Sequence, residues 1–227
     1  MFPALYAILD ASPKFSAESA LSIPEIAERL TEGGVELFQY RDKRGSARRI
    51  HGNSVELCRR LASKNVRLMV NDRADIAAMT GAGGVHVGQE DLPVAEARKI
   101  CGAPLWVGVS THNLEQLRAG DASSADYIAV GPIFPTGTKA NPDPVVGLEF
   151  LRAARQITRK PLVAIGGITV ESAGDVYEAG ADSIAVIRDL MAASDPARRA
   201  REYIAIAKSK MRADASVWEL RNRDFSG

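Results

Sequence analysis

A short segment at 39–43, QYRDK, carries an amide and two cations at alternate positions where a predicted β-strand ends. Because side chains alternate along a strand, Gln39, Arg41 and Lys43 are expected on the same side. Arg offers a planar pair of donors and Lys a point charge, and this combination suits a phosphate or diphosphate group. The alternative is a salt-bridged strand end in which Asp42 neutralises a cation.

Two carboxylates follow the next two predicted strands, Asp72 after the first of them and Asp91 in the loop after the second. Paired carboxylates bind Mg²⁺ and leave other coordination positions for water and phosphate oxygens. Beside a cationic strand end, they predict a metal ion shared with the substrate. Each also has a structural interpretation as the N-cap of the helix that follows it. No set of Cys and His residues indicates zinc.

The segment 131–139, GPIFPTGTK, has the composition of an anion-binding loop. Its small residues expose backbone N–H groups, Thr136 and Thr138 add hydroxyl donors, and Lys139 adds a positive charge. Two prolines restrict the freedom of this loop. The alternative is an ordinary surface turn.

A second phosphate site is expected at Gly166 and Gly167, because consecutive glycines let an anion approach the backbone closely. Tight packing is the alternative explanation for these glycines. Ser110, where the fifth predicted strand ends, is weaker evidence, since it binds a substrate or merely caps a helix. No Ser-His-Asp order indicates a nucleophile. We interpret His51 and His86 as structural residues.

These positions depend on an alternation of short apolar runs with longer amphipathic segments. The predicted strands are 5–10, 35–41, 66–72, 84–88, 105–110, 125–131, 162–166 and 183–188. The predicted helices are 23–32, 47–63, 74–79, 94–100, 114–119, 146–157, 171–178 and 197–208.

Eight such units predict an α/β protein with a single (β/α)8 TIM barrel, whose chemistry lies at the carboxyl ends of the strands. The barrel is expected over residues 1–210, with 211–227 as a C-terminal extension, helical or disordered. A doubly wound open sheet is the rival fold. It usually has fewer strands and often carries a glycine-rich fingerprint after the first strand, and no such fingerprint follows 5–10 here.

The composition excludes some classes of partner. The 227 residues carry a formal net charge of +1, whereas nucleic-acid-binding proteins usually carry a concentrated basic excess. No apolar run approaches the roughly 18 residues of a membrane span, and the first residues lack the basic flank of a signal peptide. We therefore expect a cytoplasmic protein without nucleic-acid or membrane partners. Cys58 and Cys101 are expected to be reduced, packed thiols. A homo-oligomer is compatible with the sequence.

Taken in order, several motifs join these features: QYRDK, the NDR of MVNDR, HVGQEDLP, VGVSTH, GPIFPTGTK, AIGGI and GADSIAV. Their order and spacing over about residues 5–190 resemble the thiamine phosphate synthases, also called thiamine-phosphate pyrophosphorylases. AIGGI is shared by many phosphate-binding barrels. The combination of QxRxK, ND, GQED and GPIFPTxTK is highly specific.

The resemblance implies an Mg²⁺-dependent alkyl transfer. The reaction joins 4-amino-2-methyl-5-hydroxymethylpyrimidine diphosphate to 4-methyl-5-(2-phosphoethyl)thiazole and gives thiamine phosphate and diphosphate. The residues implied for the pyrimidine diphosphate are Gln39, Tyr40, Arg41, Asp42, Lys43, Asn71, Ser110 and Lys139. Those implied for the thiazole phosphate are Thr136, Gly137, Thr138, Gly166, Gly167, Ile187 and Arg188. Asp72 and Asp91 are the implied Mg²⁺ ligands.

The implied catalytic residues are Arg41, Lys43 and Lys139, which stabilise the departing diphosphate without a covalent nucleophile. The C–O bond then breaks toward a cation stabilised by the pyrimidine before the thiazole nitrogen attacks. One departure from the family pattern is Arg188, where many members have Ser. It leaves the side-chain contact to the thiazole phosphate open, whereas a backbone contact at this position is still expected.

Two other functions remain open. A thiazole tautomerase of the same barrel type needs less diphosphate machinery, so the presence here of both cations and both carboxylates favours the synthase. The non-catalytic alternative is a regulatory barrel that only binds thiamine precursors. A coupling assay separates all three.

Overall fold

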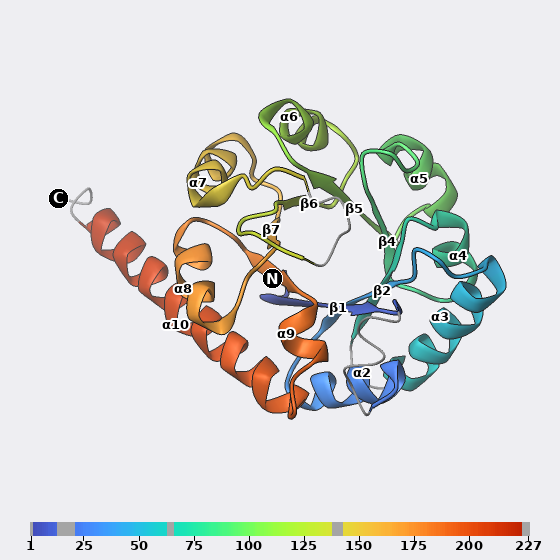
Figure 1. The fold of residues 1–227 in the computed structure, drawn as a ribbon. Coiled ribbons are helices and arrows are strands. Elements are labelled where there is room, and N and C mark those ends of the chain that lie inside the picture. The colour runs from blue at the N-terminus through green and yellow to red at the C-terminus, as the bar shows by residue number, and fades with distance from the viewer. Residues whose placement is uncertain (1, 13–20, 63–65, 138–142, 224–227) are drawn as a thin grey trace.

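The computed structural model is a closed barrel of eight parallel strands in the order β1 to β8, with β8 paired to β1 (Figure 1). The structure describes residues 2–12, 21–62, 66–137 and 143–223, and for 211–223 it describes the backbone alone. The strands are β1 Leu5–Asp10, β2 Leu37–Arg41, β3 Arg67–Asn71, β4 Gly84–Val87, β5 Trp106–Thr111, β6 Tyr127–Val130, β7 Leu162–Ile165 and β8 Ser183–Val186.

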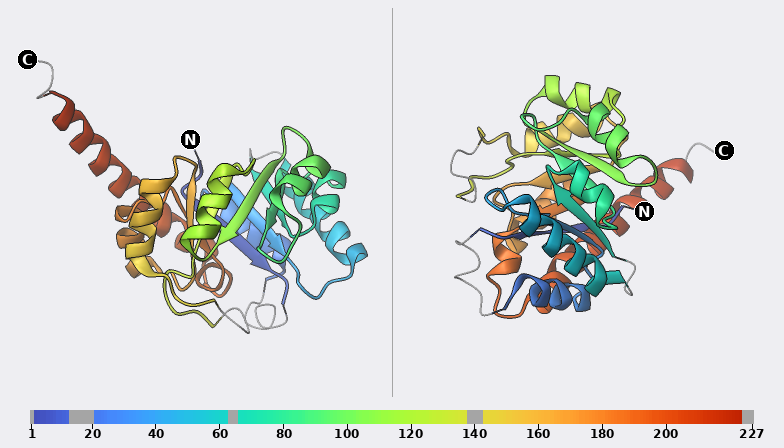
Figure 2. Two further views of the ribbon diagram at one scale, coloured as in Figure 1. Left: turned by 90° about the horizontal axis from the view of Figure 1, so that it is seen from above. Right: turned by 90° about the vertical axis from the view of Figure 1, so that its right-hand side faces the viewer.

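Helices surround the barrel on its outer side (Figures 1 and 2). They are α2 Ile23–Glu32, α3 Ala47–Leu61, α4 Ala74–Met79, α5 Val94–Cys101, α6 Leu114–Ala122, α7 Gly147–Ile157, α8 Val170–Glu178, α9 Arg188–Met191 and α10 Pro196–Arg223. The predicted (β/α)8 barrel is therefore confirmed, and the open sheet is excluded.

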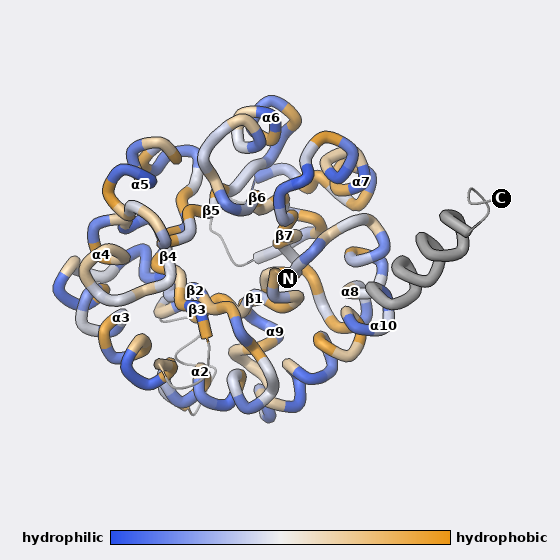
Figure 3. The backbone as a smooth tube through the Cα atoms, turned by 180° about the vertical axis from the view of Figure 1, so that it is seen from behind, coloured by the Kyte–Doolittle hydropathy of each residue, from blue (hydrophilic) through white to orange (hydrophobic). Residues whose placement is uncertain are grey.

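Two apolar layers fill the space on either side of the strands. Inward-facing residues of alternate strand positions, such as Tyr6, Leu37, Met69, Tyr127 and Val163, form one buried cluster inside the barrel. The intervening positions pack outward against the helices in a second, larger cluster. Figure 3 shows hydrophobic residues along the strands and hydrophilic ones recurring along the outer helices. The period of two along each strand thus decides which side chains reach the interior.

The amino end of the barrel is closed by aromatic side chains. The rings of Phe2 and Trp106 stack with their centroids 5.3 Å apart, and the Arg67 guanidinium lies 3.9 Å from the centroid of Trp106. These contacts lie opposite the carboxyl end of the barrel, where catalysis occurs in this fold.

Sequence signals explain several helix ends. Ser22 and Glu25 form the opening of α2, where the Ser22 N–H donates to the Glu25 carboxylate at 2.8 Å. The helix stops at Gly33, whose lack of a Cβ lets α10 approach at Ala197. Asp195 precedes α10 and accepts a hydrogen bond from the Arg198 N–H at 2.9 Å.

The carboxyl-terminal part of the chain differs from the expected boundaries. The predicted strand 183–188 ends at Val186, because Arg188 already begins the short helix α9, in which Leu190 and Met191 are buried. The last predicted helix, 197–208, is the first part of α10, which continues to Arg223 past the barrel (Figures 1 and 2). Among the described residues, no helix is long and apolar enough to cross a membrane.

Two glycine substitutions test the packing of the barrel. In Gly108→Ala the new methyl group would fall within the ring of Tyr127, so we expect a loss of about 1–3 kcal/mol in the free energy of unfolding. In Gly52→Ala, within α3, the methyl group has no atom within 4 Å, and we expect a gain of about 0.5–1 kcal/mol. Urea unfolding of both variants measures these changes. A Gly108→Ala protein as stable as wild type would contradict the packing.

Candidate active site

The alternation predicted for the end of β2 is confirmed. Gln39 is buried in the barrel interior, where its amide nitrogen donates to the Tyr6 hydroxyl at 2.8 Å. Arg41 also lies on the inner side and forms an ion pair with Asp10 at the end of β1. Lys43, just beyond the strand, reaches Asp72 at the end of β3. All three side chains therefore contact neighbouring strands across the carboxyl end of the barrel.

Asp10 is a site residue that the sequence reasoning missed. It is 2% exposed, its carboxylate accepts from the Ser12 N–H at 2.8 Å, and its own N–H contacts the Met191 sulfur at 3.2 Å. Its carboxylate orients the Arg41 guanidinium. The available signal was an acidic residue at the carboxyl end of β1, followed by a loop, at the end of the barrel where catalytic residues occur.

Tyr40 and Asp42 have side chains on the opposite face of the strand. Arg49 of α3 donates two hydrogen bonds to the Asp42 carboxylate, at 2.7 and 2.8 Å, and Asn53 donates one to the Tyr40 hydroxyl at 2.6 Å. Burial raises the pKa of Asp42, but the contacts of Arg49 outweigh it and leave the pKa below its usual value. These two side chains thus fasten β2 to α3.

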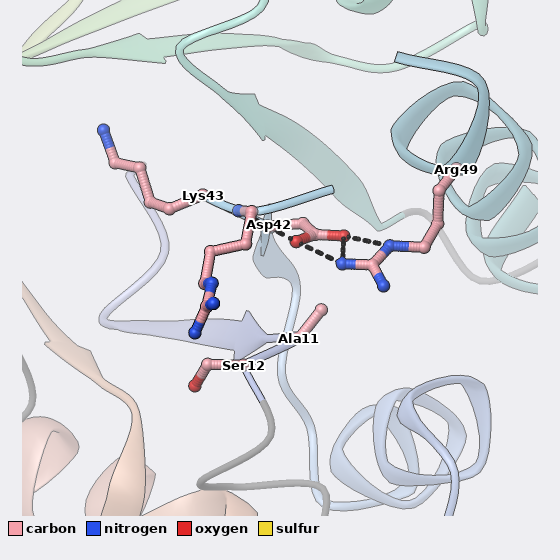
Figure 4. A pocket seen from close by; sticks show the side chains of 6 residues that line it. Ala11, Ser12, Asp42, Lys43 and Arg49 are labelled. Carbon is pink, nitrogen blue, oxygen red and sulfur yellow. Dashed lines mark hydrogen bonds and ion pairs between the residues drawn. The ribbon is translucent and has the colours of Figure 1, made fainter. Parts of the chain in front are cut away.

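A pocket of about 300 Å³ lies where the loops after β1 and β2 meet (Figure 4). Its lining residues are Ala11, Ser12, Asp42, Lys43, Arg44 and Arg49. Figure 4 shows the Lys43 side chain extending away from the paired Asp42 and Arg49. The salt-bridged strand end considered from sequence therefore exists, but Asp42 pairs with Arg49 and leaves Lys43 to other carboxylates.

Asp72 and Asp91 meet at Lys43, whose ammonium group lies 2.5 Å from Asp72 and 4.0 Å from Asp91. Neither carboxylate caps a helix, because the N-cap residues of α4 and α5 are Arg73 and Pro93. Asp91 instead accepts from the Gly88 N–H at 2.8 Å. Asp72 has a positive φ of 62°, an uncommon conformation for a residue other than glycine. The capping interpretation is wrong for both residues.

The charges of this pair are unequal. Burial and the neighbouring Asp91 carboxylate raise the pKa of Asp72 to about 6, although Lys43 opposes the shift. Burial also acts to raise the pKa of Asp91, but the contacts with Asp72, the Gly88 N–H and Lys43 lower it below its usual value. The two neighbouring carboxylates repel each other when both are ionised, so a cation bound between them stabilises the ionised pair.

Asn71 and Ser110 lie at or near the carboxyl ends of β3 and β5. Asn71 stands beside His86 of β4 in the strand register, and the His86 Nε2 atom lies 2.8 Å from the Ser110 hydroxyl. Gln89, in the loop after β4, donates to the Ser110 carbonyl at 2.6 Å. His86 therefore has a structural partner, as expected, and that partner is a predicted ligand residue.

The loop after β6 is held by β7 and the glycines that follow it. Its Ile133 and Phe134 N–H groups donate to the carbonyls of Ile165 and Gly166, at 2.9 and 3.0 Å. Gly167 has a φ of 66°, and a side chain there would collide with Phe134. The packing interpretation of the glycines is thus correct in part, since they contact the loop.

The remaining predicted thiazole phosphate residues lie in the loop after β6 and after β8. Thr136 and Gly137 lie at the end of the described part of this loop, whereas Thr138 lies outside the described residues, as does Lys139, which was predicted for the pyrimidine diphosphate. Ile187 and Arg188 follow β8, Ile187 as the N-cap and Arg188 as the first residue of α9. His112 lies beside the loop, with its Nδ1 atom 2.6 Å from the Gly131 carbonyl.

The described residues include no cluster of three or more His, Cys, Asp or Glu side chains that would enclose a metal ion alone. A cation held by Asp72 and Asp91 therefore needs oxygens from a substrate or water. The arrangement can bind a diphosphate through a cation and two basic side chains, Arg41 and Lys43. None of the described contacts forms a Ser-His-Asp arrangement.

Known proteins resemble the chain at several levels. The family model described as thiamine monophosphate synthase matches residues 5–190. The thiamine-phosphate synthase of Koribacter versatilis is 52% identical over 207 residues, which cover 91% of this chain and 97% of the relative. That of Chloroflexus aurantiacus is 44% identical over 188 residues, with 82% and 87% covered.

A solved structure agrees with these matches. The thiamine phosphate pyrophosphorylase from Pyrococcus furiosus superposes with a TM-score of 0.82 at 31% identity, covering 91% of this chain and 96% of the other. The matched span contains every described site residue discussed above. The chain is an enzyme of the transferase class and belongs to the thiamine-phosphate synthase family.

Proposed function

We propose that the protein couples hydroxymethylpyrimidine diphosphate to the phosphoethyl thiazole, with Mg²⁺, and releases thiamine phosphate and diphosphate. The observation that carries the proposal is the cluster of Arg41, Lys43, Asp72 and Asp91 at one end of the barrel. A site that binds only the thiazole phosphate does not need this set, because a tautomerase reaction releases no diphosphate and does not alter the phosphate group of its substrate. The cluster thus favours the coupling reaction over that alternative.

The donor chemistry fits Mg²⁺. Asp72 and Asp91 are hard oxygen ligands that lie close enough to share one cation, the Lys43 ammonium group. The Lys43 ammonium group therefore occupies the place proposed for Mg²⁺ between the two carboxylates. It would turn to the diphosphate when a metal ion takes this place. Bound Mg²⁺ would supply charge neutralisation to the leaving diphosphate.

The chain's own residues perform the remaining work. Arg41, positioned by Asp10, and Lys43 face the diphosphate, and Lys139 adds a third cation. Gln39, Asn71 and Ser110 hold the pyrimidine ring on the inner wall of the barrel. Neutralising the leaving group lets the C–O bond break first, and the thiazole nitrogen then attacks the pyrimidine-stabilised cation.

The second substrate binds at the same carboxyl end of the barrel, which we call its mouth. Its phosphate is assigned to the segment 136–138, to Gly166 and Gly167, and to the segment 187–188. The contacts of Ile133 and Phe134 with Ile165 and Gly166 support this assignment, since they bring the loop after β6 beside the β7 turn. Holding both substrates in one mouth raises their effective concentration and removes the need for a covalent intermediate. The ionic substrates are consistent with a cytoplasmic reaction, which we also propose.

Magnesium affinity should depend on pH. The pKa of Asp72 is about 6 without metal, so protons compete with Mg²⁺ for this carboxylate below that pH. We expect the Kd for Mg²⁺ to rise by up to about tenfold for each pH unit below 6, with proton release on binding. Isothermal titration calorimetry between about pH 5 and 8 measures both. A Kd independent of pH over this range would contradict the assignment of Asp72.

A coupling assay tests the proposed reaction. Purified protein is incubated with both substrates, and thiamine phosphate and diphosphate are quantified by chromatography. We expect the two products in equal amounts. No thiamine phosphate, together with isomerisation of the thiazole precursor, would instead support a tautomerase, and binding without turnover would support a regulatory barrel.

A further inference from the structure

A buried tyrosine of α10, Tyr203, contacts the neighbours of two segments proposed for the thiazole phosphate. Its side chain is 0% exposed, and its hydroxyl donates to the Asp189 carboxylate of α9 at 2.6 Å. The same hydroxyl lies 3.4 Å from the carbonyl of Ile168, which directly follows Gly167 in the turn after β7. One side chain therefore contacts both the β7 turn and the segment that follows β8.

The direction of the hydrogen bond to Asp189 follows from its partners. A carboxylate and a backbone carbonyl both accept, so the phenolic hydrogen of Tyr203 is the one donated. Burial and the adjacent Asp189 carboxylate raise the pKa of Tyr203 above its usual value, so the hydroxyl keeps this hydrogen. The contact with Asp189 is the shorter of the two, and a hydrogen bond to a charged acceptor is stronger than one between neutral groups.

Two residues of α10 contact the Asp189 carboxylate. Besides Tyr203, the Arg199 guanidinium lies 3.5 Å from it. Asp189 directly follows Arg188, and Ile187 is the N-cap of α9. The position of the segment 187–188 is therefore tied to α10 through the side chain of the next residue.

The other end of α9 has a separate anchor. Met191 is 2% exposed, and its sulfur accepts from the Asp10 N–H at 3.2 Å. Asp10 in turn forms the ion pair with Arg41 on the diphosphate side. Figure 1 shows α9 on the inner side of α10, next to β1. Loss of the Tyr203 hydroxyl therefore leaves the anchor on the diphosphate side in place.

We infer that Tyr203 is a positioning residue for the thiazole phosphate, because its hydroxyl holds the β7 turn and the segment 187–188 at a separation that lets both contact one phosphate. The identity of this ligand rests on the proposed function. The contacts of Tyr203 with Asp189 and Ile168 belong to the protein alone. Since the two segments follow different strands, joining them before the substrate arrives lowers the ordering cost of binding.

The link is tested without substrate by amide hydrogen exchange in Tyr203→Phe, which removes the hydroxyl and keeps the ring. The N–H groups of Leu190 and Met191 donate to the Ile187 carbonyl, at 3.2 and 3.0 Å, and report on the start of α9. We expect both to exchange about three- to tenfold faster in the variant. Exchange at the wild-type rate would overturn the link.

Tyr177→Phe is the matched control for every measurement. Tyr177 is also buried, at 4% exposed, and its hydroxyl donates to the Ala4 carbonyl at 2.8 Å, at the amino end of the barrel. We expect this variant to leave exchange in α9 at the wild-type rate. Equal acceleration in both variants would show a general loosening of the fold and would overturn the inference.

The consequence for binding is a difference between the two substrates. We expect Tyr203→Phe to raise the KM for the thiazole phosphate about three- to tenfold, with the KM for the pyrimidine diphosphate changed less than about twofold. The second value should stay low because the contact between Met191 and Asp10 remains. Steady-state kinetics with each substrate varied in turn measure both. Equal changes in the two KM values, or none, would overturn the positioning role.

Substitutions of Asp189 test the link from its other side. Asp189→Asn keeps an oxygen that accepts from Tyr203, whereas Asp189→Ala removes it. We expect the KM for the thiazole phosphate to stay within about twofold of wild type in Asn and to rise in Ala as much as in Tyr203→Phe. An Ala variant with the wild-type KM, or an Asn variant no better than Ala, would contradict the inference.

The double variant Tyr203→Phe, Asp189→Ala shows whether the two residues act together. If they form one link, the double variant should raise the KM for the thiazole phosphate no more than either single variant. Independent, multiplied effects would overturn the inference. Absence of thiamine phosphate with the wild-type protein would refute the proposed function instead, while exchange in α9 would still decide whether Tyr203 holds this helix.

Discussion

Asp72→Asn should lower kcat/KM by about 10²–10³-fold, because the amide removes one of the two charged ligands proposed for Mg²⁺. The loss should be partly recovered at high Mg²⁺ concentration. Asp75→Asn is a matched control, since Asp75 lies three residues further on in α4 and pairs only with the exposed Arg73 among the described ion pairs. Steady-state rates against Mg²⁺ concentration measure both variants. Wild-type activity in Asp72→Asn would refute the metal assignment.

The same substitution should not unfold the protein. Since the pKa of Asp72 is raised in the folded state to about 6 from an unperturbed 3.8, ionisation of this group lowers the stability of the metal-free protein as pH rises between these values. Asn cannot ionise, so this destabilisation is absent. We expect the metal-free Asn variant to be at least as stable as wild type at about pH 8 in urea unfolding. A large loss of stability would mean that Asp72 serves the fold.

Arg41→Met should affect both activity and stability. It removes a cation from the diphosphate site, with an expected loss of about 10²–10³-fold in kcat. It also leaves the buried Asp10 carboxylate without its ion-pair partner, which typically costs about 3–5 kcal/mol of the free energy of unfolding. Steady-state kinetics and urea unfolding measure the two effects.

The double variant Asp10→Asn, Arg41→Met separates these effects. Neutralising Asp10 removes the uncompensated charge, so most of the stability should return. Activity should stay low, because no cation at position 41 faces the diphosphate. Recovery of activity with stability would show that Arg41 acts only as a structural partner of Asp10.

The strands were predictable because their apolar runs are short and their inner and outer faces are both buried. β1 and α2 have the predicted boundaries, since a clear turn or cap follows each of them. The predicted strand 183–188 was too long because α9 follows β8 almost directly and continues the apolar pattern through Leu190 and Met191. An apolar run does not by itself distinguish a strand end from a short buried helix.

The site was predictable where strand alternation decides the geometry. That rule correctly placed Gln39, Arg41 and Lys43 on one side. The family motif also includes Tyr40 and Asp42, whose side chains the same rule puts on the outer face, toward α3. A motif records that residues occur together and does not state which of them contribute side chains to the mouth.

The parts of the site that escaped prediction are contacts between distant segments. Tyr6 and Tyr127 are 121 residues apart in sequence and meet inside the barrel. Their separate strands read as ordinary apolar runs with one aromatic residue each. Asp10 likewise gains its role only from Arg41, which lies on the neighbouring strand. Such pairs depend on the closure of the barrel, which local sequence patterns do not contain.

The most direct test of the account is to count both products of the coupling reaction with Mg²⁺ and with excess chelator. The proposed chemistry predicts thiamine phosphate and diphosphate in a one-to-one ratio with Mg²⁺, and neither product after chelation. Restoring Mg²⁺ should restore both products. Equal formation of thiamine phosphate with the chelator present would contradict the role of Asp72 and Asp91, and diphosphate release without thiamine phosphate would contradict the coupling itself.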